Sequence, residues 1–362
     1  MKRIFFTVTN DLNYDQRMIR ICTSLAKNNW DVTLIGRSKK TSQPIDNQIF
    51  KQKRLKLFFE KGPLFYLEFN LRLFFFLLKK ADIICSVDLD TIVGGYFASK
   101  MTNKTLIFDA HEYFEEVPEV VNRPFIQGIW RFIGQVFIPK VRAAYTVCES
   151  LKNIFSKKYN IDFLVIRNVP FFKKSEKKIT KETKKILLYQ GALNDGRGLE
   201  EIIAALPHLD GFELWLAGEG DLSTQLREQS RRNGVETRVK FMGMIAPNEL
   251  PNITAQADIG LNLLKNKGLN YYYSLANKTF DYIQAGIPAI HMDFPEYKII
   301  NDQYNIGALI SDLDEKSIIS AISEIKKSEK YEELSQNCRL AANELNWENE
   351  EQKLISFYNQ FK

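Results

Sequence analysis

The sequence has few cysteines and few histidines, and they are widely separated. Its 362 residues include four cysteines, at positions 22, 85, 148 and 338, without the spacing of a disulfide framework or a zinc site. This scarcity favours a reducing compartment. The histidines, His111, His208 and His291, are equally scattered, so we expect no histidine-based metal site.

A long apolar run is also lacking. The longest, Leu73–Leu78, is far shorter than the about 20 residues that a membrane-spanning helix needs. The first residues, MKRIFFTVTNDL, contain no small-residue cleavage site, and we interpret them as a buried strand and not as a signal peptide. A hydrophobic fraction of 45% and a charged fraction of 26% are typical of a soluble globular protein. We therefore expect the protein to be cytoplasmic.

Positive charge is concentrated in the first half of the chain. Residues 1–170 contain 26 Lys and Arg against 16 Asp and Glu, and residues 37–80 contain 11 against 3. The remainder of the chain is mildly acidic. This asymmetry indicates two lobes with different partners. Nucleic acid is not the expected partner, because the aromatic residues of the basic half lie in apolar runs and do not alternate with the basic residues.

The segment 62–80, GPLFYLEFNLRLFFFLLKK, combines apolar and basic residues. Glu68, Arg72 and Lys79 recur at helical spacing, which predicts an amphipathic helix with a narrow polar stripe. One interpretation buries this helix against a sheet. The other rests its aromatic face on an anionic membrane, so that the protein binds peripherally to the inner face of the cell membrane through residues 51–80. Both can hold for different faces. The basic residues expected to flank that contact are Lys51, Lys53, Arg54, Lys56, Lys79 and Lys80.

Short β-type apolar runs alternate with helical patterns along the chain. In the first half the expected strands are 3–9, 31–37, 81–88, 105–112 and 144–150, with a helix over 15–30. After a lysine-rich linker or surface loop at 171–185, the alternation restarts with strands at 185–193, 212–221, 239–245, 258–264 and 288–292. This pattern predicts an α/β fold with two doubly wound, Rossmann-like domains facing a cleft. We expect domains at 1–170 and 171–345, with a final helix at 346–362 packing back on the first.

Ligands of such sheets bind beyond the carboxyl ends of the strands, and one strand-end turn is rich in glycine. The sequence YQGALNDGRGLE places Gly191, Gly196 and Gly198 beside Arg197. Glycines let the backbone approach a phosphate, and the following helix start offers free N–H groups. The alternative is a tight turn with a surface arginine. The glycine spacing does not match a dinucleotide-binding fingerprint.

Three further stretches carry polar groups near strand ends. Glu219 lies in the turn LAGEGD, which by itself is equally typical of an ordinary turn. His111 follows the strand that ends near Asp109 and can bind a sugar hydroxyl or a phosphate oxygen, although a lone histidine is more often structural. A helix beginning at Asn277 or Lys278 would offer an anion site.

Asp281, one turn into that same helix, could accept hydrogen bonds from a ribose. The alternative is an ordinary capped helix, with Asn277 as the N-cap and Asp281 in the first turn.

These motifs resemble those of GT-B glycosyltransferases, specifically the large retaining family 4, over nearly the whole chain. GALNDGRG is similar to the glycine and basic element after the first strand of the second domain, and GEG at 218–220 to a later turn. ANKTFDYIQAGIPAI is similar to the segment that carries a pair of glutamates before Ala-Gly-x-Pro. HEYFEEVPE resembles a version found in bacterial members.

The resemblance implies a sugar-nucleotide donor, UDP- or GDP-linked, with no cofactor and no metal. Arg197 and Lys278 would hold the diphosphate, with Gly191, Glu219 and Asn277 lining the same site. Asp281 would bind the ribose.

On the first domain, His111 would face the transferred sugar, and Asn10 and Asp11 would line the acceptor side. The implied activity is transfer of a hexosyl group, with retention of anomeric configuration, to a glycan or lipid-linked acceptor in bacterial envelope polysaccharide synthesis.

Two positions depart from the family pattern. Tyr273 stands where the family has its first glutamate, and Ala192 stands where a basic residue is frequent. A GT-B sugar-nucleotide epimerase and a non-catalytic partner subunit remain alternatives.

Overall fold

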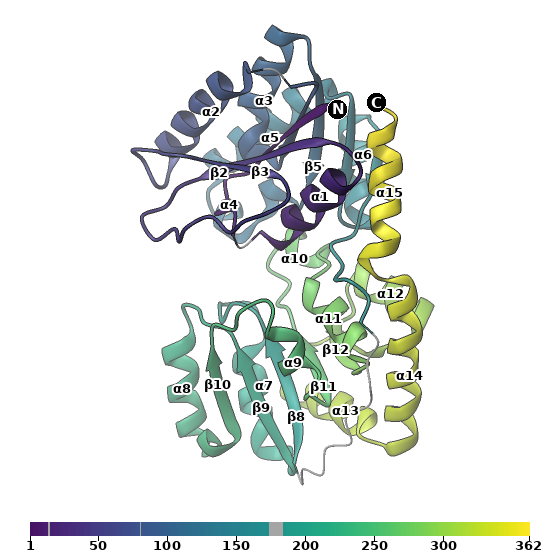
Figure 1. The fold of residues 1–362 in the computed structure, drawn as a ribbon. Helices are drawn as coiled ribbons and strands as arrows, with labels where there is room; N and C mark the ends of the chain where they lie inside the picture. Colours follow the sequence, from purple (N-terminus) through teal and green to yellow (C-terminus); the bar gives the residue numbers. More distant parts are fainter. Residues whose placement is uncertain (14, 80, 174–183) are drawn as a thin grey trace. The chain divides into compact units, whose positions relative to one another are not determined.

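The structure is a computed structural model that describes residues 1–13, 15–79, 81–173 and 184–362. Contacts divide the chain into unit 1, residues 1–168 with 350–362, and unit 2, residues 169–349. Lys80 and most of the expected linker at 171–185 lie outside the described residues. Each unit is an α/β fold with one parallel sheet (Figure 1), which confirms the predicted fold class.

Unit 1 has a sheet in the order β3-β2-β1-β4-β5-β6-β7. Its strands are β1 (Arg3–Thr7), β2 (Asp31–Arg37), β3 (Lys51–Leu55), β4 (Ile83–Val87), β5 (Thr105–Ala110), β6 (Ala143–Thr146) and β7 (Phe163–Val165). Its helices are α1 (Gln16–Lys27), α2 (Pro63–Leu77), α3 (Leu89–Thr102), α4 (Pro118–Val121), α5 (Pro124–Phe137), α6 (Glu149–Tyr159) and α15 (Trp347–Asn359), the last from Glu350 onward. The strand order reverses between β1 and β4, and crevices in such sheets open at that point.

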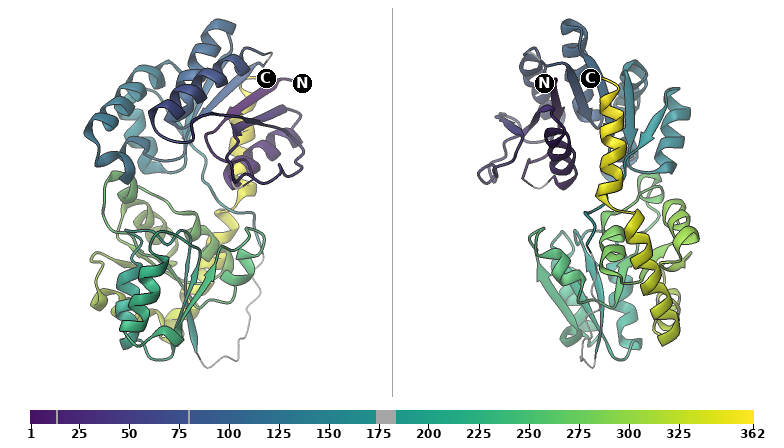
Figure 2. Two further views of the ribbon diagram at one scale, coloured as in Figure 1. Left: turned by 90° about the vertical axis from the view of Figure 1, so that its left-hand side faces the viewer. Right: turned by 45° about the vertical axis from the view of Figure 1, so that its right-hand side comes forward.

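Neighbouring residues of β1 show how this sheet is covered on both faces. The Phe5 ring lies 5.8 Å from that of Phe76, in the last turn of α2, and the Phe6 ring lies 5.9 Å from that of Tyr358 on α15. Successive side chains of a strand point to opposite faces, so α2 and α15 lie on opposite sides of the sheet, as Figure 2 also shows. Strands buried on both faces read as continuous apolar runs, which is why β1 and β4 were recognisable in the sequence.

Unit 2 has a sheet in the order β10-β9-β8-β11-β12-β13. Its strands are β8 (Lys185–Gln190), β9 (Phe212–Ala217), β10 (Val239–Gly243), β11 (Ile259–Asn262), β12 (Ala289–Met292) and β13 (Gly307–Ile310). Its helices are α7 (Leu199–Ala205), α8 (Ser223–Arg232), α9 (Leu250–Thr254), α10 (Leu269–Tyr272), α11 (Asn277–Ala285), α12 (Pro295–Tyr304), α13 (Glu315–Ile325) and α14 (Ser328–Glu344). Here the order reverses between β8 and β11, so the turn after β8 lies at the switch point.

Helix α2 has two apolar sides. Phe65, Phe69, Leu73 and Leu77 are buried, whereas Leu64, Leu67, Leu71 and Phe75 are between 54% and 67% exposed. Each set recurs at spacings of three or four residues, so each forms one stripe of the helix. The buried stripe fits the interpretation in which this helix packs against the sheet. The exposed stripe is available for contact with another surface. Within the described ranges, no helix is both long and apolar enough to cross a bilayer.

Candidate active site

The glycine turn after β8 is shaped by close contacts that only glycine allows. Gly191, Gly196 and Gly198 all have positive φ, at 130°, 81° and 67°, where other residues are strained. A Cβ at Gly198 would lie 2.4 Å from the Cβ of Leu263, the residue that follows β11 by one position. The turn is therefore pressed against the neighbouring strand end at the switch point.

Lys278 and Arg197 converge on this turn. The Lys278 Nζ lies 3.7 Å from the centre of the Tyr189 ring, and a Cβ at Gly191 would lie 3.4 Å from the same Nζ. The Arg197 guanidinium lies 4.7 Å above the ring of Tyr271. Burial, followed by the positive charge of Arg197, lowers the pKa of Lys278 well below its ordinary value. Two cations held this close favour an anion beside them.

Helix α11 supplies Lys278 from its first turn. It begins at Asn277, with Ala276 as the N-cap and no side-chain capping bond, so the alternative in which Asn277 is the N-cap does not apply. Asn277 is exposed and is the first helical residue. Alanine has no side-chain oxygen that could cap the helix, and the positive end of the helix dipole favours an anion.

Asp281 lies at the carboxyl end of β8. It is the fifth residue of α11, beyond the first turn, and its Oδ2 accepts a hydrogen bond of 2.6 Å from the Gln190 side chain. Gln190 is the last residue of β8, and the Oε1 of its side-chain amide accepts a hydrogen bond of 2.8 Å from the Thr254 hydroxyl. This chain of bonds fixes the orientation of the carboxylate. Gly191, Arg197, Lys278 and Asp281 thus lie around one strand end.

Glu219 belongs to the adjacent turn after β9. Its carboxylate accepts a hydrogen bond of 2.6 Å from Ser223 and lies 3.8 Å from the Arg227 guanidinium. The two turns are in direct contact, since a Cβ at Gly218 would lie 1.9 Å from the carbonyl oxygen of Gly191. Glu219 is therefore beside the glycine turn, with its carboxylate engaged by its own loop.

His111 lies in unit 1, just after β5, within a buried charge cluster. Its Nε2 lies 2.9 Å from Asp109 Oδ2, and Asp109 Oδ1 accepts a bond of 3.0 Å from Arg17. Its backbone N–H donates to Asp88 at 2.8 Å. Burial alone would lower the pKa of His111, but Asp109 and Asp88 outweigh it and raise the pKa to about 9. His111 is therefore protonated at neutral pH and can donate a charged hydrogen bond.

Asp88 and Asp90 are absent from the predicted site residues, although they flank Leu89 directly after β4. They line a hollow of about 190 Å³ with Val8, Thr9, Asn10, Val87, Glu112 and Phe114. The hollow lies at the β1–β4 switch point. Asp90 accepts a bond of 2.5 Å from Thr9, and burial raises its pKa to about 7. The sequence carries a signal for this site: two carboxylates, Asp88 and Asp90, stand on either side of Leu89 at the end of a predicted strand.

Asn10 lines this hollow, but Asp11 does not. The Asp11 carboxylate accepts a hydrogen bond of 2.6 Å from Arg54, and Asp11 is 8% exposed.

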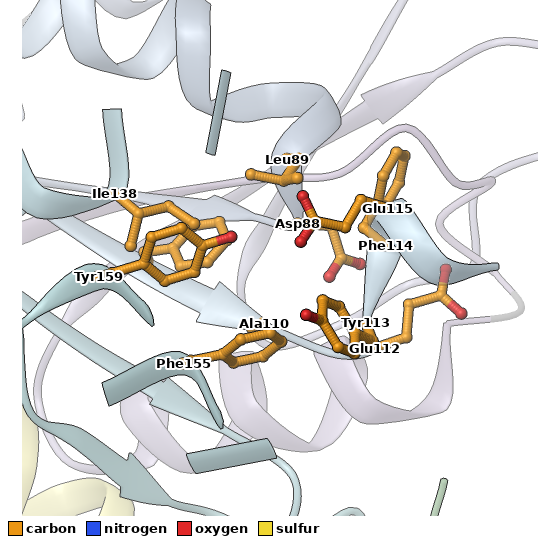
Figure 3. A pocket seen from close by; sticks show the side chains of 11 residues that line it. Asp88, Leu89, Ala110, Glu112, Tyr113, Phe114, Glu115, Ile138, Phe155 and Tyr159 are labelled. Carbon is orange, nitrogen blue, oxygen red and sulfur yellow. The ribbon is translucent and has the colours of Figure 1, made fainter. Parts of the chain in front are cut away.

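A second, smaller cavity of about 10 Å³ is lined by Asp88 and lies between Tyr113, Phe155 and Tyr159 (Figure 3). A space of this size holds a water molecule at most. In the described parts of the chain, no group of three or more His, Cys, Asp or Glu residues is arranged to hold a metal ion.

The second unit matches a protein family, and the whole chain resembles solved structures. Residues 184–328 match the family model described as Glycosyl transferases group 1. No curated protein sequence matches. Sucrose-phosphate synthase from Thermosynechococcus elongatus is 15% identical, with 99% of each chain covered and a TM-score of 0.83.

Two further solved structures are similar. Anabaena Alr3699/HepE in complex with UDP and glucose is 14% identical, with 99% of this chain and 100% of that chain covered and a TM-score of 0.80. WaaG, a glycosyltransferase involved in lipopolysaccharide biosynthesis, is 15% identical, with 98% and 99% covered and a TM-score of 0.73. At these identities the likeness shows the fold. Residues 184–328 thus match the glycosyl transferases group 1 family, and the two units have the GT-B fold of the solved structures to which this chain is similar.

Proposed function

We propose that this enzyme transfers a sugar from a nucleoside diphosphate sugar to a hydroxyl of a glycan or lipid-linked acceptor in the synthesis of cell-envelope polysaccharide, with retention of anomeric configuration. The observation that carries the proposal is the convergence of Arg197 and Lys278 on the glycine turn after β8. A doubly charged diphosphate is the anion that suits two neighbouring cations and a helix start.

The donor binds in unit 2 through its diphosphate and its ribose. Lys278 and Arg197 bind the phosphates, and binding of the anion raises the lowered pKa of Lys278, so that the amine is charged in the complex. Asp281, oriented by Gln190, accepts hydrogen bonds from the ribose hydroxyls. UDP is the first nucleotide to test, because the Anabaena HepE structure is described as a complex with UDP and glucose.

Catalysis follows from stabilising the leaving group. The bond between the anomeric carbon and the phosphate oxygen breaks, the acceptor oxygen bonds to that carbon from the same face, and its proton passes to the leaving diphosphate. Arg197, Lys278 and the start of α11 stabilise the charge that develops on the diphosphate. The protonated His111 donates a hydrogen bond to the transferred sugar. Because cationic side chains face the leaving group, the reaction as proposed needs no metal ion.

The acceptor side is the hollow of unit 1. Asp88, Asp90 and Glu112 offer carboxylate oxygens, and Thr9 and Asn10 offer a hydroxyl and an amide. Such groups bind the hydroxyls of a sugar, which donate hydrogen bonds to carboxylates. This composition favours a polyhydroxyl acceptor and disfavours a phosphate at that point.

Peripheral contact with an anionic membrane is supported by the exposed stripe of α2. Leu64, Leu67, Leu71 and Phe75 are exposed. An open hollow of about 430 Å³ between Leu55, Lys56, Arg72, Phe75 and Phe76 adjoins the stripe. Apolar residues beside basic ones are typical of surfaces that rest in a lipid headgroup region. We therefore propose that the enzyme acts at the inner face of the cell membrane.

The function is tested by nucleotide binding and by product analysis. Isothermal titration with UDP and with GDP should show one clear preference. Lys278→Ala and Asp281→Ala should each weaken binding about 10- to 100-fold, the equivalent of one charged hydrogen bond. Lys298→Ala and Asp302→Ala are matched controls, because these residues form an exposed pair on α12. NMR of the product from a UDP- or GDP-sugar and a glycan acceptor should show the donor's anomeric configuration.

Two outcomes would contradict the proposal. Conversion of the free sugar nucleotide to an epimer, without an acceptor, would favour the epimerase. Absence of binding by either nucleotide would favour a non-catalytic partner subunit.

A further inference from the structure

We propose that Tyr271 is a positioning residue for the donor: its ring holds the Arg197 guanidinium against the glycine turn. The inference rests on the proposed role of Arg197 in binding the diphosphate and adds the group that orients it. Tyr271 ends no strand and carries no charge, and the sequence motifs do not include it.

The ring of Tyr271 touches both Arg197 and the residue before it. The guanidinium carbon lies 4.7 Å from the centre of the ring, within the range of a cation–π interaction. A Cβ at Gly196 would lie 3.1 Å from Tyr271 Cε2. The ring therefore lies directly against Gly196, and a side chain at position 196 would push it away from Arg197.

Other anchors of the guanidinium are lacking in the described part of the chain. No carboxylate forms an ion pair with Arg197 there, and its buried Nε has no hydrogen-bond partner. The nearby carboxylates are engaged elsewhere, since Lys265 lies 3.0 Å from Glu201 and Lys267 pairs with Asp195. The stacked ring orients the guanidinium and leaves its terminal N–H groups available for phosphate oxygens.

The segment that carries Tyr271 is joined to the glycine turn by a backbone hydrogen bond. The Lys265 backbone N–H donates to the Gly196 carbonyl at 3.0 Å. Helix α10 starts immediately after Gly268, whose carbonyl accepts a bond of 3.1 Å from the Tyr271 N–H. The ring is thus held over Arg197 by the backbone bond at Lys265 and by the first turn of α10.

The test is a double-mutant cycle between Tyr271 and Arg197, read by titration with UDP or GDP, whichever binds the unsubstituted protein. Tyr271→Phe keeps the ring and should bind like the unsubstituted protein. Tyr271→Leu should weaken binding about 3- to 10-fold, as expected for loss of a cation–π contact. In the Arg197→Ala background, Tyr271→Leu should have no further effect, because its effect acts through Arg197. Tyr272→Leu, in the same helix but packed on Phe294, controls for a general disturbance of α10.

A second readout separates positioning from folding. The nucleoside monophosphate lacks the outer phosphate, so Tyr271→Leu should reduce the preference for the diphosphate over the monophosphate, with little change in melting temperature. Equal weakening of both nucleotides, an additive effect in the Arg197→Ala background, or a Tyr271→Phe variant as weak as Tyr271→Leu would overturn the inference. If Arg197→Ala itself binds normally, the proposed donor site fails instead, whatever Tyr271 does.

Discussion

The histidines of this protein illustrate how strongly the surroundings of one residue set its charge. His111 lies beside two carboxylates, which raise its pKa to about 9. His291 is buried beside the Thr279 hydroxyl, and burial, followed by the charge of Lys278, lowers its pKa to about 3. Composition could not distinguish these two residues, because the difference arises from neighbours that are distant in the sequence.

We predict that His111 titrates near pH 9 when followed by NMR of histidine-labelled protein. Asp109→Asn should lower its pKa by at least one unit, because it removes the closest negative charge. His111→Gln identifies the resonance. A His111 resonance that titrates near pH 6.5 in the unsubstituted protein would contradict the charge cluster.

The same shift predicts a pH dependence of stability. A pKa raised on folding stabilises the folded state fully below the unfolded value of about 6.5, and this contribution is lost as the pH rises through about 9. The free energy of unfolding of the unsubstituted protein, relative to His111→Gln, should therefore fall between these two values. Urea unfolding at a series of pH values measures the difference, which a parallel dependence of the two proteins would refute.

Much of the proposed donor site is suggested by the sequence, but its connections are not. Gly191, Arg197 and Lys278 are candidates because glycines and cations stand beside strand ends and a helix start. Nothing in the sequence indicates that Gln190 binds Asp281 or that Tyr271 stacks on Arg197, since both contacts depend on how β8 and the segment before α11 pack. Asp88 and Asp90 could be assigned to the hollow only once the pairing of β4 with β1 was known.

At the level of elements, the buried strands were predicted best. The bounds of β2 were predicted as the structure has them, and β1, β4 and β8 were within a few residues. In the described sheets, the edge strand β10 was predicted, but the other three edge strands were missed: β3 has the sequence KQKRL, with alternate residues exposed, and β7 and β13 have only three and four residues. An edge strand is hydrogen-bonded to a neighbour on one side only and often carries polar residues. Such a strand lacks the apolar run that marks a central strand.

Helix α2 allows a test of membrane contact without loss of fold. The double substitution Leu67→Glu and Leu71→Glu should reduce binding to anionic liposomes about tenfold or more, because both side chains lie on the exposed stripe and would lose apolar burial. Ile299→Glu with Leu340→Glu, exposed apolar residues of unit 2, is the matched control. Co-sedimentation at low and high salt measures both. Equal, salt-insensitive binding by all three proteins would exclude a docking role for α2.

Two glycines of helix α5 should respond oppositely to the same change. Gly128 has no atom within 4 Å of the position of an added Cβ, so Gly128→Ala should stabilise unit 1 by about 1 kcal/mol through helix propensity. At Gly134 the added Cβ would lie 2.8 Å from the Tyr159 hydroxyl, and the resulting shift should cancel or exceed that gain. Thermal unfolding of the two variants compares them; a similar gain in both would mean that Tyr159 moves aside freely.

Among the described residues, the cores of unit 1 and of unit 2 are built from different side chains. Tyr358 of α15 belongs to the core of unit 1: its hydroxyl lies 3.2 Å from that of Tyr145, and its ring packs on Phe6 and Trp30. The core of unit 2 is built from other residues, among them Leu187, Leu214 and Ile290. The nucleotide residues proposed above lie in unit 2 alone.

Tyr358→Ala should therefore destabilise unit 1 by about 3–5 kcal/mol, the usual cost of removing a buried aromatic side chain. Tyr358→Phe should cost only about 1 kcal/mol, because it loses the hydroxyl contact alone. Hydrogen exchange with and without UDP or GDP resolves the units: exchange should rise in β1 and β6, while protection of the turn after β8 by nucleotide persists. Loss of that protection in Tyr358→Ala would show that the cores are coupled.

The order of the chain gives α15 a consequence during synthesis. Unit 2 is inserted between β7 and the last helix, and residues 350–362 complete unit 1. A ribosome therefore finishes unit 2 before it adds Tyr358, whose side chain packs against Phe6 and Tyr145. Until then, the face of the first sheet opposite α2 lacks its final helix, so the nascent chain holds a complete unit 2 and an incomplete unit 1. A chaperone that binds exposed aromatic surface has its longest opportunity there.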